Sequence, residues 1–491
     1  MCVRFLLLVS SAIAIATFAS GAVAKVPQEF APCTDANTRP ELAQSLCLSA
    51  TLPFWHDKRD DGRTAEVFVR KFPATRSKGS VWLVAGGPGE SGASLYPHLK
   101  SLRKAFAGLD LLIPDHRGTG FSTRLCPKEE AVTSPGGASL IGDEWASCIG
   151  SLWAKPEDVA AFSITQAARD LDRLMRDHPA KGRTFVYGVS YGSQLVLRML
   201  SLTDIKIDGV IFDSLVPIQT DERFDLSRRS QVVDEVGREV LMRCDSDPAC
   251  HARSKEPASR RLQYLYAQLS ASPKTIEGQT FDDIALKGLL GQMLDVPKAR
   301  QQIFDLVLDI EAGRTERLSN VVSILKAASS AAYPQSPISI PLVSVISASE
   351  NTLRSKVTAA EIKAEQDDLL FTSPLPALLA GNGMPTYGRD AFFGTEPNFL
   401  PPTLVLQGTL DPKTPYVAAR EHIARLPGRS VSLITVENAP HFILWAAPRC
   451  FETEIADFIG RVHRKRLVRP GTCALTPHST GRPTAAGEFE R

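Results

Sequence analysis

A serine stands between two glycines directly after a run of strand-forming residues, in the stretch Phe185-Val-Tyr-Gly-Val-Ser-Tyr-Gly-Ser-Gln194. The five residues from Gly188 to Gly192 match the pattern G-x-S-x-G. On a tight turn from a strand into a helix, side chains at the two glycine positions would collide with the neighbouring strand and helix. Such a turn lifts Ser190 above the sheet, where its hydroxyl can attack a carbonyl group.

A serine hydroxyl becomes a good nucleophile only beside a base, and that base needs a group that orients it. In folds with this turn, the acid and then the histidine follow the serine along the chain. Asp411 comes just after an expected strand at 404–407, and His441 comes just after another at 430–436, each on a loop. Active groups of parallel sheets collect at such strand ends. The sequence therefore predicts a triad of Ser190, Asp411 and His441.

Other residues compete for these roles. Asp213 follows the expected strand 205–212 and is the alternative acid. Considered alone, Asp411 is typical of a turn or helix-capping aspartate, and His441 is typical of a structural loop histidine. Their order along the chain, however, favours the triad. Asp115 and His116 precede the serine in a glycine-containing loop, so we expect structural roles for them.

The reaction also needs donors that stabilise a negatively charged oxygen. The segment Ala85-Gly-Gly-Pro-Gly89 follows an expected buried strand at 80–84, which is where the second such donor of this fold lies. We assign the oxyanion hole to the backbone N–H groups of Gly87 and Tyr191. The Gly87–Pro88 bond is a candidate for the cis form. A phosphate-binding loop is excluded, because no G-K-[ST] follows the glycines.

The elements around these motifs favour an α/β fold. From about residue 55 to 220, strands alternate with amphipathic helices, which predicts a mostly parallel sheet with helices on both faces. The pattern then changes to long helical periods, which indicates an inserted helical cap, before alternation returns. The expected segments are a signal peptide at 1–24, the first part of the core at 25–220, a cap at 221–397, the second part of the core at 398–475, and a disordered tail at 476–491.

The charge balance gives no reason to expect a nucleic-acid partner. The 491-residue chain has 56 basic and 54 acidic side chains, a formal net charge of +2, and 43% hydrophobic residues. This composition is ordinary for a globular protein. The locally basic run 461–469 fits the solvated end of a helix better than a binding patch.

The first residues have the pattern of a secretory signal. Arg4 precedes an apolar stretch from Phe5 to about Phe18, and small residues follow up to Ala22-Val-Ala24. We expect cleavage after Ala24, with an uncleaved anchor helix as the alternative. No later stretch has about 20 consecutive apolar residues, so no membrane attachment is expected after cleavage. The expected location is periplasmic or secreted.

Cysteine usage agrees with export. Eight cysteines remain after the leader, and eight thiols allow about 105 pairings. They fall into four pairs that are local in sequence, which are the pairings we expect: Cys33 with Cys47, Cys126 with Cys148, Cys244 with Cys250, and Cys450 with Cys473. No zinc-binding spacing is present, and no metal or other cofactor is expected.

Five ordered motifs together resemble a known family: GGPG at 86–89, DHRGTGFS at 115–122, GVSYGSQ at 188–194, GTLDPKTP at 408–415 and NAPHF at 438–442. They look like the α/β-hydrolase family of proline iminopeptidases and, more closely, the secreted tripeptidyl-aminopeptidase-like hydrolases of bacteria. The resemblance covers roughly residues 50–475. It implies a serine exopeptidase that acts at peptide N-termini, with a helical cap over the sheet.

The resemblance also suggests how substrate binds. Acidic cap residues of that family bind the free α-ammonium group, and Glu350 stands after an apolar run where such a residue is expected; a solvent-facing glutamate is the alternative. Two departures are Ala85 in place of a histidine and the lack of a cysteine before Glu350. The expected function is a secreted aminopeptidase that releases short N-terminal fragments through an acyl-enzyme and takes peptides with a free N-terminus. A carboxylesterase and a non-catalytic scaffold with a decayed site are the alternatives.

Overall fold

The computed structural model describes residues 28–474, except 58, 60, 277–278, 330–332, 382, 429–430 and 465–469. The expected signal peptide at 1–24 and the expected tail at 476–491 lie outside the described residues. All elements below refer to the described part of the chain.

One ten-stranded sheet forms the centre of the protein, in the order β1-β2-β3-β5-β4-β6-β7-β10-β11-β12. The strands from β5 to β12 in this order pair in parallel, and β1, β2 and β3 form an antiparallel edge that joins β5. The expected mostly parallel sheet is confirmed. The strand bounds are β1 (Ala31–Pro32), β2 (Leu46–Pro53), β3 (Thr64–Phe72), β4 (Gly79–Val84), β5 (Asp110–Pro114), β6 (Arg183–Val189), β7 (Gly209–Asp213), β10 (Thr403–Gly408), β11 (Val431–Glu437) and β12 (Gly471–Ala474).

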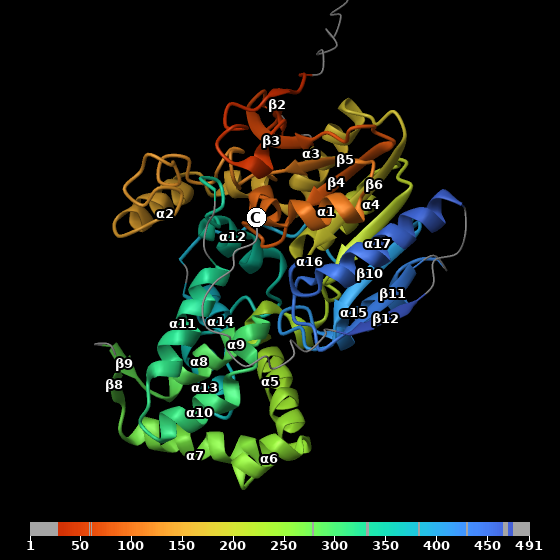
Figure 1. Ribbon diagram of the computed structural model, residues 1–491. Helices are drawn as coiled ribbons and strands as arrows, with labels where there is room; N and C mark the ends of the chain where they lie inside the picture. The colour runs from red at the N-terminus through yellow and green to blue at the C-terminus, as the bar shows by residue number, and fades with distance from the viewer. Residues whose placement is uncertain are drawn as a thin grey trace, which may run out of the picture.

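Helices cover both faces of the sheet (Figure 1). One face packs against α1 (Leu99–Ala105), α16 (Ile443–Ala446) and α17 (Pro448–His463), and the other packs against α3 (Ile164–Asp177), α4 (Tyr191–Leu202) and α15 (Tyr416–Arg425). All of β4 is buried, and its side chains alternate between two apolar clusters, with Val81 and Leu83 on the α1 side and Trp82 and Val84 on the α3 side. This two-sided burial explains the continuous apolar run in the sequence.

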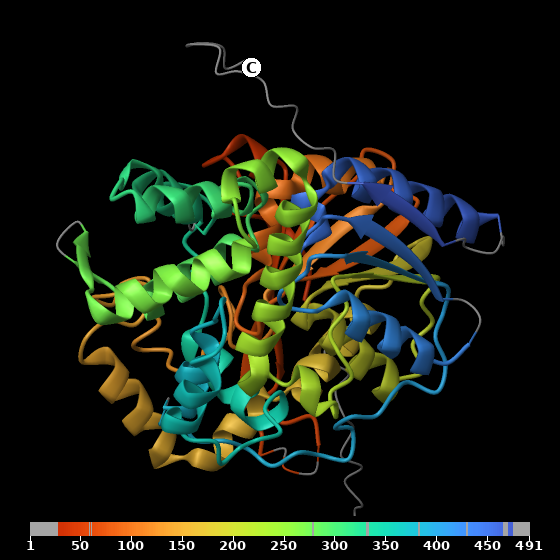
Figure 2. The same ribbon diagram turned by 90° about the horizontal axis from the view of Figure 1, so that it is seen from below.

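A large helical segment lies between β7 and β10 in the chain and forms the lower part of the molecule in Figure 1. Its helices α5 to α11 build a separate apolar cluster around residues such as Leu262, Leu290 and Leu306. In Figure 2, which shows the molecule from below, these yellow-green to green helices lie on the side that faces the viewer. The bounds are α5 (Arg229–Ser246), α6 (Pro248–Ser254), α7 (Ala258–Ala271), β8 (Lys274–Ile276), β9 (Gln279–Phe281), α8 (Asp283–Met293), α9 (Pro297–Arg300), α10 (Ile303–Glu311), α11 (Glu316–Ala328), α12 (Ile340–Glu350), α13 (Ala359–Gln366) and α14 (Leu375–Ala380).

Helix α12 differs from the other helices of this segment. Its residues Leu342, Val345 and Ile346 belong to the apolar cluster on the α3 side of the sheet. The segment is therefore anchored in the core through α12. The remaining elements are α2 (Glu144–Ala154) and five short 3-10 helices, η1 (Pro40–Leu42), η2 (Gly92–His98), η3 (Pro156–Phe162), η4 (Glu222–Phe224) and η5 (Leu226–Arg228).

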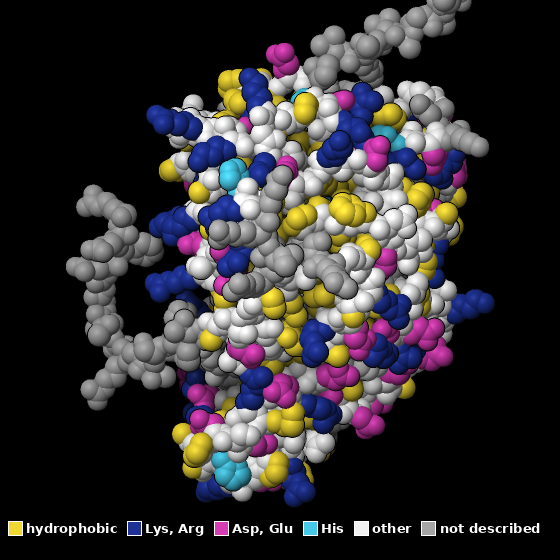
Figure 3. All heavy atoms as spheres, turned by 90° about the vertical axis from the view of Figure 1, so that its right-hand side faces the viewer, with side chains coloured by type: hydrophobic (Ala, Val, Ile, Leu, Met, Phe, Trp, Pro, Cys, Tyr) yellow, Lys and Arg dark blue, Asp and Glu magenta, His cyan; other side chains and the backbone are white. Residues whose placement is uncertain are grey.

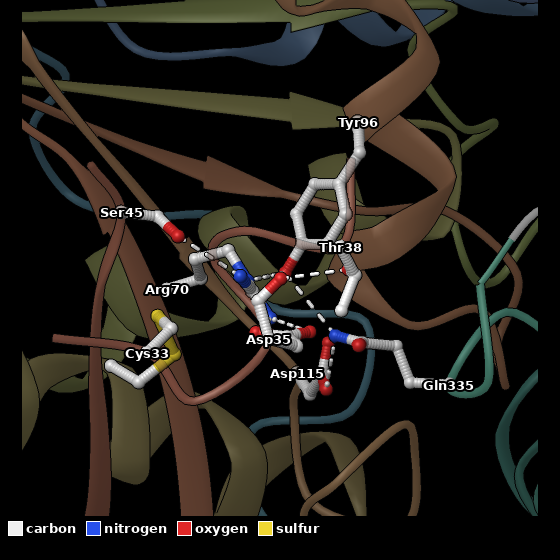
Figure 4. The surroundings of a disulfide bond; sticks show 9 residues. Cys33, Asp35, Thr38, Ser45, Arg70, Tyr96, Asp115 and Gln335 are labelled. Carbon is white, nitrogen blue, oxygen red and sulfur yellow. Dashed lines mark hydrogen bonds and ion pairs between the residues drawn. A yellow bond between two sulfur atoms is a disulfide. The ribbon is translucent and has the colours of Figure 1, made fainter. Parts of the chain in front are cut away.

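Four disulfides join the cysteines in the sequence-local pairs that the sequence favours: Cys33–Cys47, Cys126–Cys148, Cys244–Cys250 and Cys450–Cys473. The surroundings of the first are shown in Figure 4. The buried guanidinium of Arg70 donates to both carboxylate oxygens of Asp35 at 2.8 and 2.7 Å and to the phenol of Tyr96 at 3.1 Å. Gln335, which precedes α12, donates to the same phenol at 3.2 Å. The network therefore connects the N-terminal loop, the sheet and the segment before α12.

Charged side chains of both signs are interspersed on the face shown in Figure 3. This mixture agrees with the nearly balanced count of basic and acidic residues. Within the described part of the chain, none of the helices has the length and apolar character needed to cross a bilayer.

Candidate active site

Ser190 occupies the turn between β6 and α4 with φ of 53° and ψ of −124°. A residue with a side chain rarely adopts a positive φ. A Cβ atom at Gly188 would lie 2.5 Å from the carbonyl oxygen of Gly192, and one at Gly192 would lie 2.5 Å from that of Val84. Both distances are far inside van der Waals contact, so both glycines are required by the close packing of strand and helix. The steric reason expected from the sequence is confirmed.

Asp411 and His441 are brought together at the ends of β10 and β11. His441 Nδ1 lies 2.8 Å from Asp411 Oδ2 and 3.0 Å from Oδ1. The loop of His441 fits closely against β10, because a Cβ atom at Gly408 would lie 2.4 Å from the carbonyl oxygen of Ala439. The arrangement can hold one imidazole tautomer, with its proton on Nδ1 directed at the carboxylate.

The carboxylate of Asp411 is fully buried and held by several donors. Its Oδ1 accepts the backbone N–H groups of Lys413 and Thr414, both at 2.8 Å, and its Oδ2 accepts the Thr414 hydroxyl at 2.8 Å and the Gln407 amide at 3.1 Å. Burial opposes ionisation of Asp411, but the charge and hydrogen bond of His441 and these N–H donors outweigh it, and its pKa is lowered below 3.8. Asp411 is thus an anion across the neutral pH range.

Asp213, the alternative acid, has different partners. Its carboxylate accepts the backbone N–H groups of Ile443 and Leu444 at 2.8 and 2.9 Å and the phenol of Tyr187 at 3.0 Å. Burial raises the pKa of Asp213 above 3.8. The imidazole of His441 is hydrogen-bonded to Asp411 instead.

Ser190 opens onto a cavity of about 80 Å³. Gly87 and Tyr191 line it as well, and the Gly87–Pro88 peptide bond is cis. Tyr191 is the first residue of α4, and the first N–H groups of a helix have no acceptor within it. The walls are formed by Gly87, Pro88, Ser190, Tyr191, Gln194, Val216, Pro217, Ile218, Gln219, Asp221, Phe224, Asp225, Leu226, Arg229, Asn351, Lys413 and Thr414. The oxyanion-hole assignment stays a prediction that is compatible with this placement.

The nucleophile and the histidine share a neighbour. Thr414 lines the cavity together with Ser190, and its hydroxyl lies 3.3 Å from His441 Nδ1. Among the described contacts, none joins the hydroxyl of Ser190 to His441. Such bonds are often long in the absence of substrate and tighten when it binds.

Glu350 lies at the end of α12 with only 3% of its surface exposed. Its carboxylate forms an ion pair with Arg198 at 3.0 Å, accepts the phenol of Tyr387 at 2.8 Å and accepts the N–H of Ile164 at 3.2 Å. It does not line the cavity, whereas the next residue, Asn351, does. The alternative of a solvent-facing glutamate is wrong, because the side chain is buried and paired. The proposed contact with a substrate ammonium group remains a prediction.

Asp115 and His116 have structural contacts. Asp115 accepts the N–H groups of Gly92 and Phe121 at 2.8 and 2.9 Å, and burial raises its pKa to about 6. His116 Nδ1 lies 3.1 Å from the carbonyl oxygen of Arg117, and burial lowers its pKa to about 4. These contacts hold the loop that follows β5.

The residues that hold Asp411 and His441 in place were not predicted in this role from the sequence. Thr414 and Gln407 bind Asp411, and Asp213 binds the turn after His441. Thr414 has a local signal, because Asp411-Pro-Lys-Thr414 places a hydroxyl and an N–H three residues after an aspartate, as in a side-chain-capped turn. The role of Asp213 has no such signal, because its partners lie about 230 residues later in the chain and are reached only when β7 pairs with β10.

One group of potential metal ligands occurs within the described ranges: Cys33, Asp35 and Cys47. The two sulfur atoms are joined in a disulfide, so they do not offer thiolate ligands.

Comparisons with known proteins find similarity over both parts of the sheet-forming core. A family model described as "alpha/beta hydrolase fold" matches residues 80–256, and one described as "TAP-like protein" matches residues 378–470. Serine protease Hip1 of Mycobacterium tuberculosis and of Mycobacterium bovis are each 22% identical to this chain over 472 residues, with 88% of both chains covered. The crystal structure of proline iminopeptidase from Mycobacterium smegmatis is 13% identical, with 85% of this chain and 99% of that chain covered and a TM-score of 0.39.

The two family models indicate the same fold as the mostly parallel sheet and the turn at Ser190. The chain has the α/β-hydrolase fold, its residues 80–256 and 378–470 match the α/β-hydrolase and TAP-like family models, and these similarities support a serine hydrolase.

Proposed function

We propose that this serine hydrolase is an exported peptidase that releases short fragments from peptides with a free N-terminus. The observation that carries the proposal is the hydrogen bond between His441 and Asp411 beside the cavity onto which Ser190 opens. The TAP-like segment and the similarity to a protein named as a serine protease favour an amide bond as the target.

In the proposed mechanism, Ser190 Oγ attacks the substrate carbonyl while His441 Nε2 takes its proton. Asp411 holds the proton on Nδ1 and stabilises the imidazolium that forms. The N–H groups of Gly87 and Tyr191 stabilise the negatively charged oxygen. His441 then donates its proton to the leaving amine, and an acyl-enzyme remains on Ser190. Water, deprotonated by His441, releases the acyl group and restores the serine.

Export is supported by the disulfides. Four cross-links in one chain are typical of oxidising compartments, and the leader pattern up to Ala24 provides a route there. Expression of the full chain in a bacterial host, followed by N-terminal sequencing of the periplasmic fraction, tests this part. A mature N-terminus at Lys25 is expected.

The catalytic assignment is tested with a fluorophosphonate probe, which reacts with activated serines. Wild-type protein should be labelled and Ser190→Ala should not. Asp411→Asn should lower the labelling rate by about 10³- to 10⁴-fold, because the amide favours the wrong imidazole tautomer. Labelling of Ser190→Ala at the wild-type rate would remove this serine from the site.

The peptidase assignment is tested with peptide anilides that have a free or an acetylated N-terminus. Faster cleavage of the free form is expected. Equal cleavage of both would contradict the N-terminal preference, and cleavage of small esters without cleavage of either anilide would support a carboxylesterase.

A further inference from the structure

Arg229 is the first residue of α5, and it lines the cavity onto which Ser190 opens. A guanidinium group has five N–H donors. Within the described part of the chain, the guanidinium of Arg229 makes one hydrogen bond, a long one of 3.5 Å from Nη1 to the carbonyl oxygen of Pro412. Most of its donors are therefore available to a ligand.

The fold gives little reason for a cation at this position. The N-terminal end of a helix carries a partial positive charge, so an arginine there is unfavourable. Burial lowers the pKa of Arg229, which shows that the surroundings oppose its charge. Asp411 and Asp295 are the acids that favour the charge, but Asp411 is bound by His441 and Asp295 is paired with Lys413.

The acids that line the cavity are already occupied, in contrast to Arg229. Asp221 accepts the N–H and the guanidinium of Arg223, which lies two residues further along the chain. Asp225 accepts the N–H and hydroxyl of Ser227 and the N–H of Leu353. The donors of Arg229 are thus the charged groups of the cavity wall that most lack partners.

We propose that Arg229 binds a carboxylate group of the substrate. A planar guanidinium matches a carboxylate through two parallel hydrogen bonds, which makes arginine the suitable side chain for this ligand. The inference deepens the proposed peptidase function and rests on it, because it defines the substrate class as anionic peptides. When a substrate carboxylate binds, it provides the hydrogen-bond acceptors that the partly buried guanidinium of Arg229 otherwise lacks.

The carboxylate has two possible sources. Arg229 contacts the 411–414 loop, which also binds His441, and the leaving amine receives its proton from His441. The C-terminal carboxylate of a short leaving peptide therefore reaches Arg229 on this side. An acidic side chain of the substrate is the other source with the same chemistry.

The test measures how short peptides protect Ser190 from a neutral fluorophosphonate probe. One series ends in a free carboxylate or a carboxamide, and a second series carries a glutamate or a glutamine side chain with the C-terminus amidated. The wild type should be protected about 10-fold or more better by the free acid of the first series, as expected for a hydrogen bond between charged groups. Preference within the second series alone would assign the site to an acidic side chain.

Two variants identify the residue responsible. In Arg229→Gln, peptide acids and peptide amides should protect Ser190 equally well. In Arg238→Gln, the wild-type preference for acids should remain. Arg238 is a suitable control, because it lies on the same helix with 41% of its side chain exposed and pairs with Asp234. Arg229→Gln should also unfold at the wild-type temperature or above it, since it removes a poorly paired cation.

The outcomes separate this inference from its rivals. A wild type that treats acids and amides alike in both series, or an Arg229→Gln protein that keeps the preference, would overturn it. If Arg229 only supports the charge of Asp411, Arg229→Gln would instead slow labelling by the probe alone and would change acids and amides equally. Protection does not require turnover, so a failure to cleave peptides would refute the proposed function without deciding this experiment.

Discussion

The backbone carbonyl oxygen of Asp213 accepts the N–H of Ser190 at 2.9 Å. The carboxylate of the same aspartate accepts the N–H groups of Ile443 and Leu444, in the turn directly after His441. One residue at the end of β7 therefore fixes both the nucleophile turn and the histidine turn. The distance between Ser190 and His441 depends on this connection.

We expect Asp213→Asn to misplace His441. Asparagine has one acceptor oxygen and an NH₂ group, so at least one of the two backbone N–H groups loses its acceptor. A shift of about 1 Å in a catalytic group costs about 10²-fold in rate, and the unsatisfied N–H costs about 1–3 kcal/mol of unfolding free energy. Fluorophosphonate labelling rates and urea unfolding measure the two effects.

The matched control is Asp208→Asn, just before the opposite end of the same strand. The carboxylate of Asp208 accepts the N–H of Thr184 at 2.9 Å, far along the sheet from the site. This variant should keep the labelling rate of the wild type. If Asp213→Asn is labelled as fast as Asp208→Asn, the connection through Asp213 does not position the histidine.

Local motifs made part of this site predictable from the sequence. The glycines around Ser190 mark its turn, and Asp411 and His441 each follow a strand within a short, recognisable loop. The role of Asp213 was not predictable, because its two sets of partners are joined only when β7 lies between β6 and β10. Its own strand begins at Gly209, later than the expected start at 205, since the hydroxyl of Thr203 accepts the N–H of Ile205 in a turn.

The environment of Glu350 was not predictable from the local sequence either. Its position after an apolar run suggested an acid that is free to bind substrate, but burial and Arg198 decide its environment. Arg198 lies on α4, 152 residues earlier in the chain, in a helix whose apolar neighbours gave no sign of a buried ion pair. Pairing over such a distance depends on how α12 packs against the core.

We expect Glu350→Gln to lower stability, because it removes the buried partner of Arg198 and leaves this cation only the more exposed and more distant carboxylate of Asp390, at 3.6 Å. Breaking a buried ion pair on one side costs about 3–5 kcal/mol. The double variant Glu350→Gln with Arg198→Met should lose less than the sum of the two single variants, since the uncompensated charge is gone. Urea unfolding of the four proteins provides the comparison.

The same variant tests the proposed role in substrate binding. If Glu350 binds the ammonium group, Glu350→Gln should raise KM for free-amine peptides more than for acetylated ones. An equal change for both, together with the loss of stability, would assign Glu350 to the fold alone.

Gly408 determines how closely the His441 loop approaches β10. A Cβ atom there would lie 2.4 Å from the carbonyl oxygen of Ala439 and 2.5 Å from that of Pro440. Because both obstacles are backbone atoms, Gly408→Ala must displace the loop, and we expect a loss of about 1–3 kcal/mol of stability together with slower labelling of Ser190. Thermal unfolding and probe labelling measure these two effects.

Gly288→Ala is the contrasting substitution. Gly288 lies in α8, and a Cβ atom there would meet no other atom within 4 Å. Alanine favours a helix over glycine by about 1 kcal/mol, so this variant should be as stable as the wild type or slightly more so. Equal destabilisation by both substitutions would contradict the steric explanation for Gly408.

His116 should make the protein less stable in mild acid. Burial lowers its pKa from 6.5 to about 4, so the folded protein keeps the imidazole neutral while the unfolded chain binds a proton. The unfolded state therefore binds more protons between about pH 6.5 and 4, and stability falls as the pH falls through this range. Each unit of pKa difference corresponds to about 1.4 kcal/mol.

The neighbouring Asp115 has the opposite effect on the pH dependence of stability, because burial raises its pKa to about 6. The contribution of His116 is isolated by subtracting the unfolding free energy of His116→Gln from that of the wild type at each pH, since Asp115 is present in both proteins. This difference should decrease steadily from pH 7 to pH 4, and a difference that does not change with pH would show that His116 is protonated equally in the folded and unfolded chains.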